Sequence, residues 1–239
     1  MDIDKGTYLI DKPRGWTSFD CVAKIRSELL KKANPPTLNS YGRAGSQEQI
    51  ANSLRLRVGH TGTLDPFATG LLIILVGPAT KKQTNYMKLD KEYEAILFLG
   101  ATSTTGDPEG VISKKLNVHK IYKEEIKHAL KQFTGVIEQV PPQYSAIKVK
   151  GKPAYKLARA GQKVNLKPRK ITVYNIEILD YKWPKLKLKV NCSSGTYIRT
   201  LAEDIGRVLG CGAYLTSLNR TKIGNLSLEK AKKLEELLS

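Results

Sequence analysis

The stretch GHTGTLDPFATGLLIILVG, Gly59 to Gly77, joins a turn-rich segment to a strongly apolar one. Its apolar half has the length of a buried strand and is too short to span a bilayer. Its turn-rich half places one carboxylate, Asp65, and one histidine, His60, among glycines and threonines. Pro66 biases Asp65 towards an extended backbone, and the glycines allow another backbone or a ligand to approach closely. An Asp-Pro turn by itself is more often structural than catalytic, so the role of Asp65 depends on the rest of the chain.

The alternation of apolar and polar residues on both sides of this stretch predicts further strands. They are expected at 6–10, 91–100, 171–181 and 185–192. Several of them follow one another directly, with few strong helices between them. We therefore predict an α+β fold with a large mixed, mostly antiparallel sheet flanked by helices.

Three helices are predicted from apolar residues at helical spacing. The first follows Thr17, which forms a capping box with Asp20, and the last is a continuous C-terminal helix capped by Ser227. Their expected buried stripes are Phe19, Val22, Ile25 and Leu29; Tyr122, Ile126, Ala129, Leu130 and Phe133; and Leu228, Ala231, Leu234 and Leu238. Residues 31–54, rich in Pro, Gly, Ser and Asn, are predicted to form a variable loop or insertion.

The charge of the chain indicates a polyanionic partner. Lys and Arg number 40 against 22 Asp and Glu, which gives a formal net charge of +18. Basic residues between 145 and 170 have no acidic residue among them, and Tyr144 and Tyr155 lie beside or within the run. Cations that follow a phosphate backbone and exposed rings that stack on bases are typical of RNA binding. Nucleic acid is therefore favoured over a membrane surface, and the bland alternative is a solvated basic face.

Common cofactor and metal patterns are missing from the sequence. It has neither a phosphate-binding Gly-x-x-x-x-Gly-Lys-Ser/Thr loop nor a zinc-binding His-Glu-x-x-His helix, and its three histidines are scattered. We expect a reaction without a cofactor or a metal. The three cysteines have no metal-like spacing and the N-terminus does not resemble a signal peptide, so we expect a cytoplasmic protein. Arg199, two residues after Tyr197, is the candidate partner that would keep Asp65 ionised.

The stretch VGHTGTLDPFATGLL resembles the motif of the TruB-type tRNA pseudouridine-55 synthases. Four other segments resemble motifs of the same family, so the resemblance covers nearly the whole chain from Gly6 onward. These segments are LIDKPRGWTSFD, KEYEAILFLGATSTTGD, VPPQYSAIKVKGKPAYKLARAG and CSSGTYIRTLAEDIGRVLGCGAYLTSLNRTKIG.

The resemblance implies a site for isomerising a flipped uridine. Asp65 would be the nucleophile, Tyr93 would stack on the target base near C5, and Arg199 would pair with Asp65. The other residues would bind the RNA or support the site: His60, Tyr197, Leu218, Lys12, Lys148 and Lys150. Isomerisation of a nucleotide involves no redox step, so the resemblance also implies no cofactor.

The resemblance further implies a single catalytic domain over 1–239, with a thumb insertion at about 137–166 that grips RNA. The family's C-terminal PUA-type domain is expected to be absent, because the sequence stops at Ser239. The expected partner is the T stem-loop of tRNA, bound by a monomer without guide RNA and without a membrane. Two alternatives stay open: a guide-dependent relative that works in a ribonucleoprotein, and a non-catalytic RNA chaperone.

Overall fold

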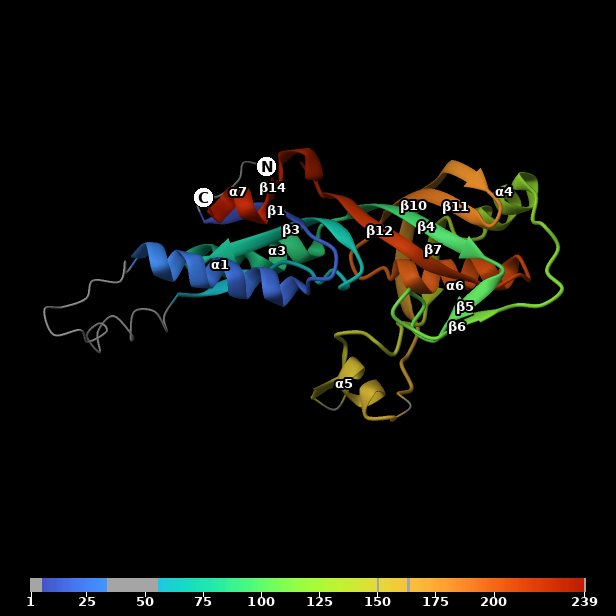
Figure 1. Ribbon diagram of the computed structural model, residues 1–239, viewed down its shortest axis with the longest axis horizontal. Coiled ribbons are helices and arrows are strands. Elements are labelled where there is room, and N and C mark those ends of the chain that lie inside the picture. Colours follow the sequence, from blue (N-terminus) through green and yellow to red (C-terminus); the bar gives the residue numbers. More distant parts are fainter. Residues whose placement is uncertain (1–5, 34–55, 150, 163, 239) are drawn as a thin grey trace, which may run out of the picture. The chain divides into compact units, whose positions relative to one another are not determined.

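The computed structural model describes residues 6–33, 56–149, 151–162 and 164–238 (Figure 1). Most of the predicted insertion at 31–54, and Lys150 of the thumb, lie outside the described residues. The chain forms two compact units. Unit 1 comprises Met1–Leu89 and Arg220–Ser239, and unit 2 comprises Asp90–Asn219.

Unit 1 is built on a small sheet in which β3 is the central strand. β3 pairs antiparallel with β1 and with β2, and β1 pairs parallel with β14. The elements of unit 1 are β1 (Thr7–Lys12), α1 (Ser18–Ala33), β2 (Val58–His60), β3 (Thr69–Val76), η1 (Gly77–Lys82), α3 (Gln83–Lys88), β13 (Leu226–Ser227), η2 (Leu228–Lys230), β14 (Lys232–Lys233) and α7 (Leu234–Leu238).

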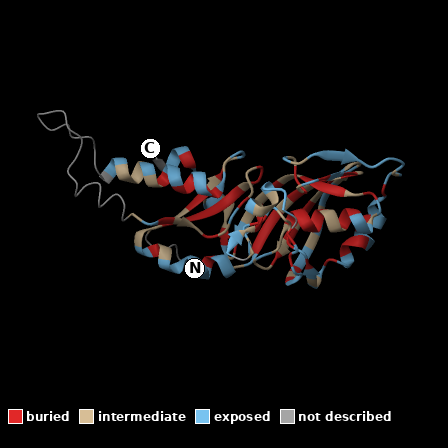
Figure 2. Ribbon diagram, turned by 90° about the horizontal axis from the view of Figure 1, so that it is seen from below, coloured by how far each residue is buried: buried red, intermediate tan, exposed pale blue. Residues whose placement is uncertain are grey.

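The uninterrupted apolar run of β3 is explained by burial on both faces of the sheet. Leu71, Ile73 and Leu75 pack in one core cluster with residues that include Tyr86 of α3. Leu72 and Ile74 point the other way, into a second cluster with residues of α1 and α7. A strand covered on both faces needs no polar alternation, and Figure 2 shows such buried residues along the strands.

The first helix begins as predicted but buries a different stripe. Thr17 Oγ1 accepts from the backbone of Asp20 at 3.0 Å, and Asp20 Oδ2 accepts from the backbone of Thr17 at 2.8 Å, which confirms the capping box. The prediction that Phe19 is buried is wrong, because its side chain is 65% exposed. Cys21, together with the predicted Val22 and Ile25, forms the buried face instead.

The predicted continuous C-terminal helix is also wrong. The segment forms the short helix η2, then β14, then the five-residue helix α7. Lys232 and Lys233 pair with Ile10 and Asp11 of β1, and this pairing requires an extended backbone where the sequence pattern favours a helix. Leu234 of the predicted stripe is buried in unit 1. The side chain of Ser227 makes no capping hydrogen bond.

Unit 2 contains an antiparallel sheet in the order β4-β11-β10-β7. β12 (Ala213–Ile223) starts in unit 2 and passes into unit 1 after Asn219. The other elements of unit 2 are β4 (Lys91–Leu99), β5 (Ala101–Ser103), β6 (Ile112–Lys114), α4 (Lys123–Lys131), β7 (Gly135–Gln139), β8 (Lys148–Val149), β9 (Lys152–Pro153), α5 (Ala154–Arg159), β10 (Arg169–Lys182), β11 (Lys185–Cys192) and α6 (Ile198–Val208).

The strands of unit 2 alternate as the sequence predicts. Leu186, Leu188 and Val190 of β11 are buried, whereas Lys187 forms an ion pair of 2.7 Å with Glu94 of β4. This sheet therefore has a buried and a polar face. Helix α4 buries Ile126, Ala129 and Leu130 as predicted, but Tyr122 is 66% exposed at its N-cap and does not belong to the stripe. The mixed, mostly antiparallel α+β fold is confirmed.

The chain between β7 and β10 forms a small structure with its own core. The two-residue strands β8 and β9 pair, α5 follows them, and Ala154, Val164 and Leu166 are buried together. This segment coincides with most of the predicted thumb (α5 in Figure 1). In the described part of the chain, no helix is long and apolar enough to cross a membrane.

Candidate active site

Asp65 lies on a loop whose backbone is held at almost every residue. The hydroxyl of Ser18, at the start of α1, accepts from the backbone of Leu64 at 2.8 Å and donates to its carbonyl at 3.3 Å. The Asp65 carbonyl accepts from Ala68 at 3.1 Å, and the Pro66 carbonyl accepts from Gly15 at 2.8 Å. A loop held in this way keeps the backbone of Asp65 in one position, which helps to place its carboxylate for catalysis.

Two buried cations complete the support of this loop. Lys12 is fully buried, and its Nζ donates to the carbonyls of Pro13 at 2.9 Å, Trp16 at 2.6 Å and Pro66 at 3.4 Å. Burial lowers the pKa of Lys12, and Arg220 lowers it further, while the negative charge of Asp65 opposes both effects. The predicted supporting role of Lys12 is therefore compatible with its position. Arg220, to which sequence reasoning gave no role, donates to the carbonyls of Gly62 and Thr63 in the loop and to that of Leu71 in β3.

His60 ends β2 at the beginning of the same loop. Its Nδ1 accepts from the backbone of Gly62 at 3.3 Å, and its carbonyl accepts from Gln83 Nε2 at 2.7 Å. Burial lowers the pKa of His60, and the positive charge of Arg220 lowers it further. The imidazole is therefore neutral at physiological pH, which suits a ring that would support bases by stacking.

Arg199 is buried in unit 2, at the start of α6, with 4% of its surface exposed. Its guanidinium donates to the carbonyls of Thr105 at 3.1 Å and Tyr144 at 2.9 Å, and lies 3.6 Å from Asp107 Oδ2. The other carboxylate oxygen, Asp107 Oδ1, accepts from Thr105 Oγ1 at 2.5 Å and from the backbone of Glu109 at 3.0 Å. These contacts fix the direction of the guanidinium.

The predicted pairing of Arg199 with Asp65 joins residues of different units and stays a prediction. Sequence reasoning missed Asp107. The signal was present, because Asp107 precedes Pro108 in a turn rich in small residues, as Asp65 precedes Pro66.

Gln139 is a second residue that sequence reasoning missed. It is 2% exposed, and its amide bonds both backbone groups of Tyr197. Gln139 Oε1 accepts from the Tyr197 N–H at 2.8 Å, and Gln139 Nε2 donates to the Tyr197 carbonyl at 3.0 Å. This amide fixes the N-terminus of α6, and with it the backbone from which Tyr197 and Arg199 project.

Two other predicted residues lie in the sheet of unit 2. Tyr93 lies on β4 opposite Val190 of β11 and is 9% exposed. Leu218 lies on β12 and is 5% exposed. Both side chains are buried, and their roles towards a substrate stay predictions.

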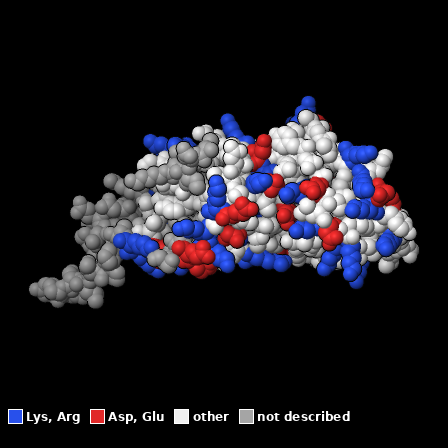
Figure 3. All heavy atoms as spheres, turned by 90° about the horizontal axis from the view of Figure 1, so that it is seen from above, with Lys and Arg blue, Asp and Glu red and all other residues white. Residues whose placement is uncertain are grey.

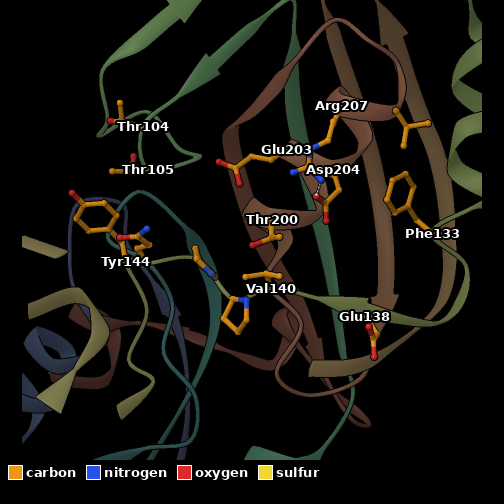
Figure 4. A pocket seen from close by; sticks show the side chains of 14 residues that line it. Thr104, Thr105, Phe133, Glu138, Val140, Tyr144, Thr200, Glu203, Asp204 and Arg207 are labelled. Atoms are coloured by element: carbon orange, nitrogen blue, oxygen red, sulfur yellow. Dashed lines mark ion pairs between the residues drawn. The ribbon is translucent and has the colours of Figure 1, made fainter. Parts of the chain in front are cut away.

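A pocket of about 670 Å³ lies in unit 2 beside the residues that hold Arg199. Thr105 and Tyr144, whose carbonyls bind Arg199, line it together with Glu138, Glu203 and Asp204 (Figure 4). Asp204 forms an ion pair of 2.8 Å with Arg207, while burial and the charge of Asp204 raise the pKa of Glu203. Such an acidic wall disfavours phosphate, so we do not place the RNA backbone there.

The thumb presents exposed cations. Lys148, Lys152, Lys156 and Arg159 are exposed, and the Arg159 guanidinium lies 5.8 Å above the ring of Tyr155. None of the described basic residues between 148 and 170 forms an ion pair with a carboxylate. Lys148 is thus available for phosphate, whereas Lys150 lies outside the described residues. On the face shown in Figure 3, Lys and Arg are widespread, with acidic residues in groups between them.

The three cysteines are poorly suited to act as nucleophiles. The three cysteines are free and buried, and burial raises the pKa of Cys21 and of Cys192 to about 11, so neither is a ready nucleophile. Within the described part of the chain, no group of His, Cys, Asp or Glu side chains could hold a metal ion.

Two family models together match residues 49–239. The model described as TruB family pseudouridylate synthase (N terminal domain) matches residues 49–198, and the tRNA pseudouridylate synthase B C-terminal domain matches residues 199–239. The chain belongs to the TruB family. It is therefore a pseudouridine synthase, an isomerase, as the sequence motifs predict.

Curated relatives in this family are similar over almost the whole chain. The tRNA pseudouridine synthase B of Cupriavidus metallidurans is 46% identical over 97% of this chain and 67% of its own length. The enzyme of the same name from Parabacteroides distasonis is 41% identical over 99% of this chain and 94% of its own length.

Chains of two solved ribonucleoprotein or protein complexes share the fold. A chain of a Cbf5-Nop10-Gar1 complex has a TM-score of 0.67 and 27% identity, and the match covers 98% of this chain and 53% of that one. A chain of an H/ACA RNP bound to a substrate RNA containing 2'-deoxyuridine has a TM-score of 0.65 and 26% identity, with 98% and 52% covered. This chain thus spans about half the length of these solved relatives.

Proposed function

We propose that the protein converts uridine 55 in the T loop of tRNA to pseudouridine, with Asp65 as the nucleophile. The relatives that are 41% and 46% identical are named tRNA pseudouridine synthase B, which supports tRNA as the substrate. The observation that carries the assignment of Asp65 is the loop itself. The carbonyls of His60 and of every residue from Gly62 to Pro66 accept a hydrogen bond. The backbone that carries the Asp65 side chain is therefore held in place.

The reaction breaks the bond from C1′ to N1 of uridine and forms a bond from C1′ to C5. The proton on C5 leaves and N1 gains one, so the isomerisation is balanced without an oxidant or a second substrate. An ionised carboxylate could attack C1′ of the ribose or C6 of the ring, and either route needs a nucleophile held still beside the turning base. Asp65 would supply this group, with Arg199 stabilising its charge.

The uridine must leave its stack before the carboxylate can reach it. Tyr93 and His60 would replace the lost stacking, Tyr197 and Leu218 would line the space for the flipped nucleotide, and Lys12 would hold the loop. The thumb would bind phosphates of the T stem-loop, since contacts to phosphate position an RNA without reading its sequence.

The test is to incubate the wild-type protein with an unmodified tRNA transcript, without guide RNA, and to map pseudouridine by position. We expect modification at position 55, and Asp65→Asn should bind the transcript normally but produce none. Asp180→Asn, which alters an exposed carboxylate on β10, is the matched control and should retain full activity.

Each alternative predicts a different result. Activity only with a guide RNA would indicate the ribonucleoprotein type of enzyme. Binding and refolding of tRNA without any pseudouridine would indicate a chaperone. Wild-type modification by Asp65→Asn would show that another group is the nucleophile.

A further inference from the structure

Arg220 is buried in contact with the loop that bears Asp65. It is 1% exposed and lies on β12, just inside unit 1. Its Nε donates to the Leu71 carbonyl at 2.8 Å, Nη2 donates to the Gly62 carbonyl at 3.2 Å, and Nη1 donates to the Thr63 carbonyl at 3.5 Å. One guanidinium thus joins the chain shortly before Asp65 to the strand that follows the loop.

The chemistry of this contact differs from that of an ordinary buried arginine. Removing a guanidinium from water is costly, and a carboxylate partner commonly offsets the cost. No carboxylate among the described residues forms an ion pair with Arg220, and its acceptors are backbone carbonyls. Because buried charges are weak evidence for a purely stabilising role, a geometric role explains the arginine better.

The carbonyls that Arg220 binds indicate that it positions the part of the loop before Asp65. Ser18 of α1 binds Leu64 and Lys12 of β1 binds Pro66, and these two residues are the neighbours of Asp65. Arg220 binds the carbonyls of Gly62 and Thr63 and also that of Leu71, so it connects this part of the loop to β3. A planar group with several donors in fixed directions can join three carbonyls at once, which a lysine ammonium does with less geometric definition.

We propose that Arg220 is a positioning residue for catalysis, which fixes the Gly62–Thr63 segment against β3 and so sets the direction of Asp65. This inference rests on the proposed role of Asp65 as the nucleophile. Arg220 does not touch the substrate in this account, and it acts through the backbone of the loop. Its positive charge also reaches His60 in the same loop, whose pKa it lowers, and this gives the role a second observable.

The experiment uses Arg220→Lys, which keeps the charge, and Arg220→Gln, which removes it. The matched control is Arg26→Lys, because Arg26 of α1 also donates to a backbone carbonyl in unit 1, that of Val58 at 3.1 Å. The measurements are the single-turnover rate at saturating tRNA transcript, the Kd for the transcript, and thermal denaturation to confirm folding at the assay temperature.

A misplaced nucleophile slows chemistry without weakening RNA binding. We expect both Arg220 variants to lose at least about tenfold in single-turnover rate, with Kd within about threefold of wild type. Arg26→Lys should keep the wild-type rate. In a histidine NMR titration, the pKa of His60 should rise in Arg220→Gln and stay close to wild type in Arg220→Lys, because only the first loses the charge.

Wild-type rates in the folded Arg220 variants would overturn the proposal. A loss of folding in both variants would also overturn it, because Arg220 would then serve the whole unit rather than the loop. If Arg26→Lys lost as much single-turnover rate as the Arg220 variants, the proposal would also be overturned, because the effect would not be specific to Arg220. Activity of Asp65→Asn in the same assay identifies the other failure, that of the proposed nucleophile, because it does not depend on Arg220.

Discussion

The buried cations of the candidate site and the exposed cations of the thumb share a charge and little else. Lys12, Arg199 and Arg220 are at most 4% exposed and bind backbone carbonyls at short distances. Lys148, Lys152 and Lys156 point into solvent from a small structure with a minor core. The first group fixes the places of other atoms, whereas the second is free to follow a phosphate backbone.

This difference separates geometry from affinity. A buried cation whose partners are fixed is insensitive to salt, and its loss should change the rate of the reaction. An exposed cation is screened by salt, and its loss should change the binding of RNA. The net charge of +18 thus includes buried cations that position other groups and exposed cations that are available to bind RNA.

The largest effect is expected from Asp107→Asn in the buried group. This change removes the buried negative charge of Asp107 from beside the buried Arg199 guanidinium, so we expect a loss of about 3–5 kcal/mol in the free energy of unfolding and a strongly reduced single-turnover rate. Denaturant unfolding and rapid-quench kinetics measure the two quantities.

The control for this prediction is Asp204→Asn. It breaks the pair with Arg207, whose side chain is 75% exposed, and should cost at most about 1 kcal/mol. Equal losses in the two variants would remove the distinction between buried and exposed charges on which the comparison depends.

A smaller effect, confined to binding, is expected from neutralising the thumb with Lys148→Gln, Lys152→Gln and Lys156→Gln together. If each lysine contacts one phosphate, the slope of log Kd against log salt should fall by about 0.7–0.9 for each lysine. The single-turnover rate at saturating RNA should not change. Salt titrations of a labelled T stem-loop give the slope.

The matched variant neutralises three exposed lysines of α4, Lys123, Lys127 and Lys131, in the same unit. It should leave the slope close to wild type. If both triple variants flatten the slope equally, the affinity comes from the net charge of the protein and not from the thumb.

The smallest effect is expected at His60, whose pKa is lowered first by burial and then by the positive charge of Arg220. The pKa of His60 is below 6.5 in the folded protein, so the unfolded chain binds a proton first as the pH falls below 6.5. Stability should therefore decrease from about pH 6.5 down to the folded pKa, and no further below it. Thermal denaturation against pH shows this, and an unchanged profile in His60→Gln would contradict it.

Much of the fold could be predicted because local pattern and tertiary burial agree. The strands β1, β3, β4, β10 and β11 were all expected close to their observed positions. The exceptions are places where a distant partner decides. Lys232 and Lys233 are extended because β1 offers a strand edge, and Phe19 is exposed although its spacing fits the apolar stripe.

The candidate site was predictable only in part. Asp65 and Arg199 lie within long motifs, and the geometry around each of them is ordered. Sequence reasoning missed Asp107, Gln139 and Arg220, which act by binding other groups of the protein: the Arg199 guanidinium, the Tyr197 backbone and the Asp65 loop. Such contacts leave no regular spacing in the sequence. The repeated Asp-Pro pair was the one signal that could have indicated Asp107.

The division of the chain has a consequence for synthesis on the ribosome. Unit 2 is a continuous segment, whereas unit 1 needs residues from both sides of it. The carbonyl of Leu71 can accept its hydrogen bond from Arg220 only after that residue has been added, 149 residues later. The loop that bears Asp65 is therefore synthesised long before Arg220. In a nascent chain that ends before β12, this loop lacks the hydrogen bonds that Arg220 donates.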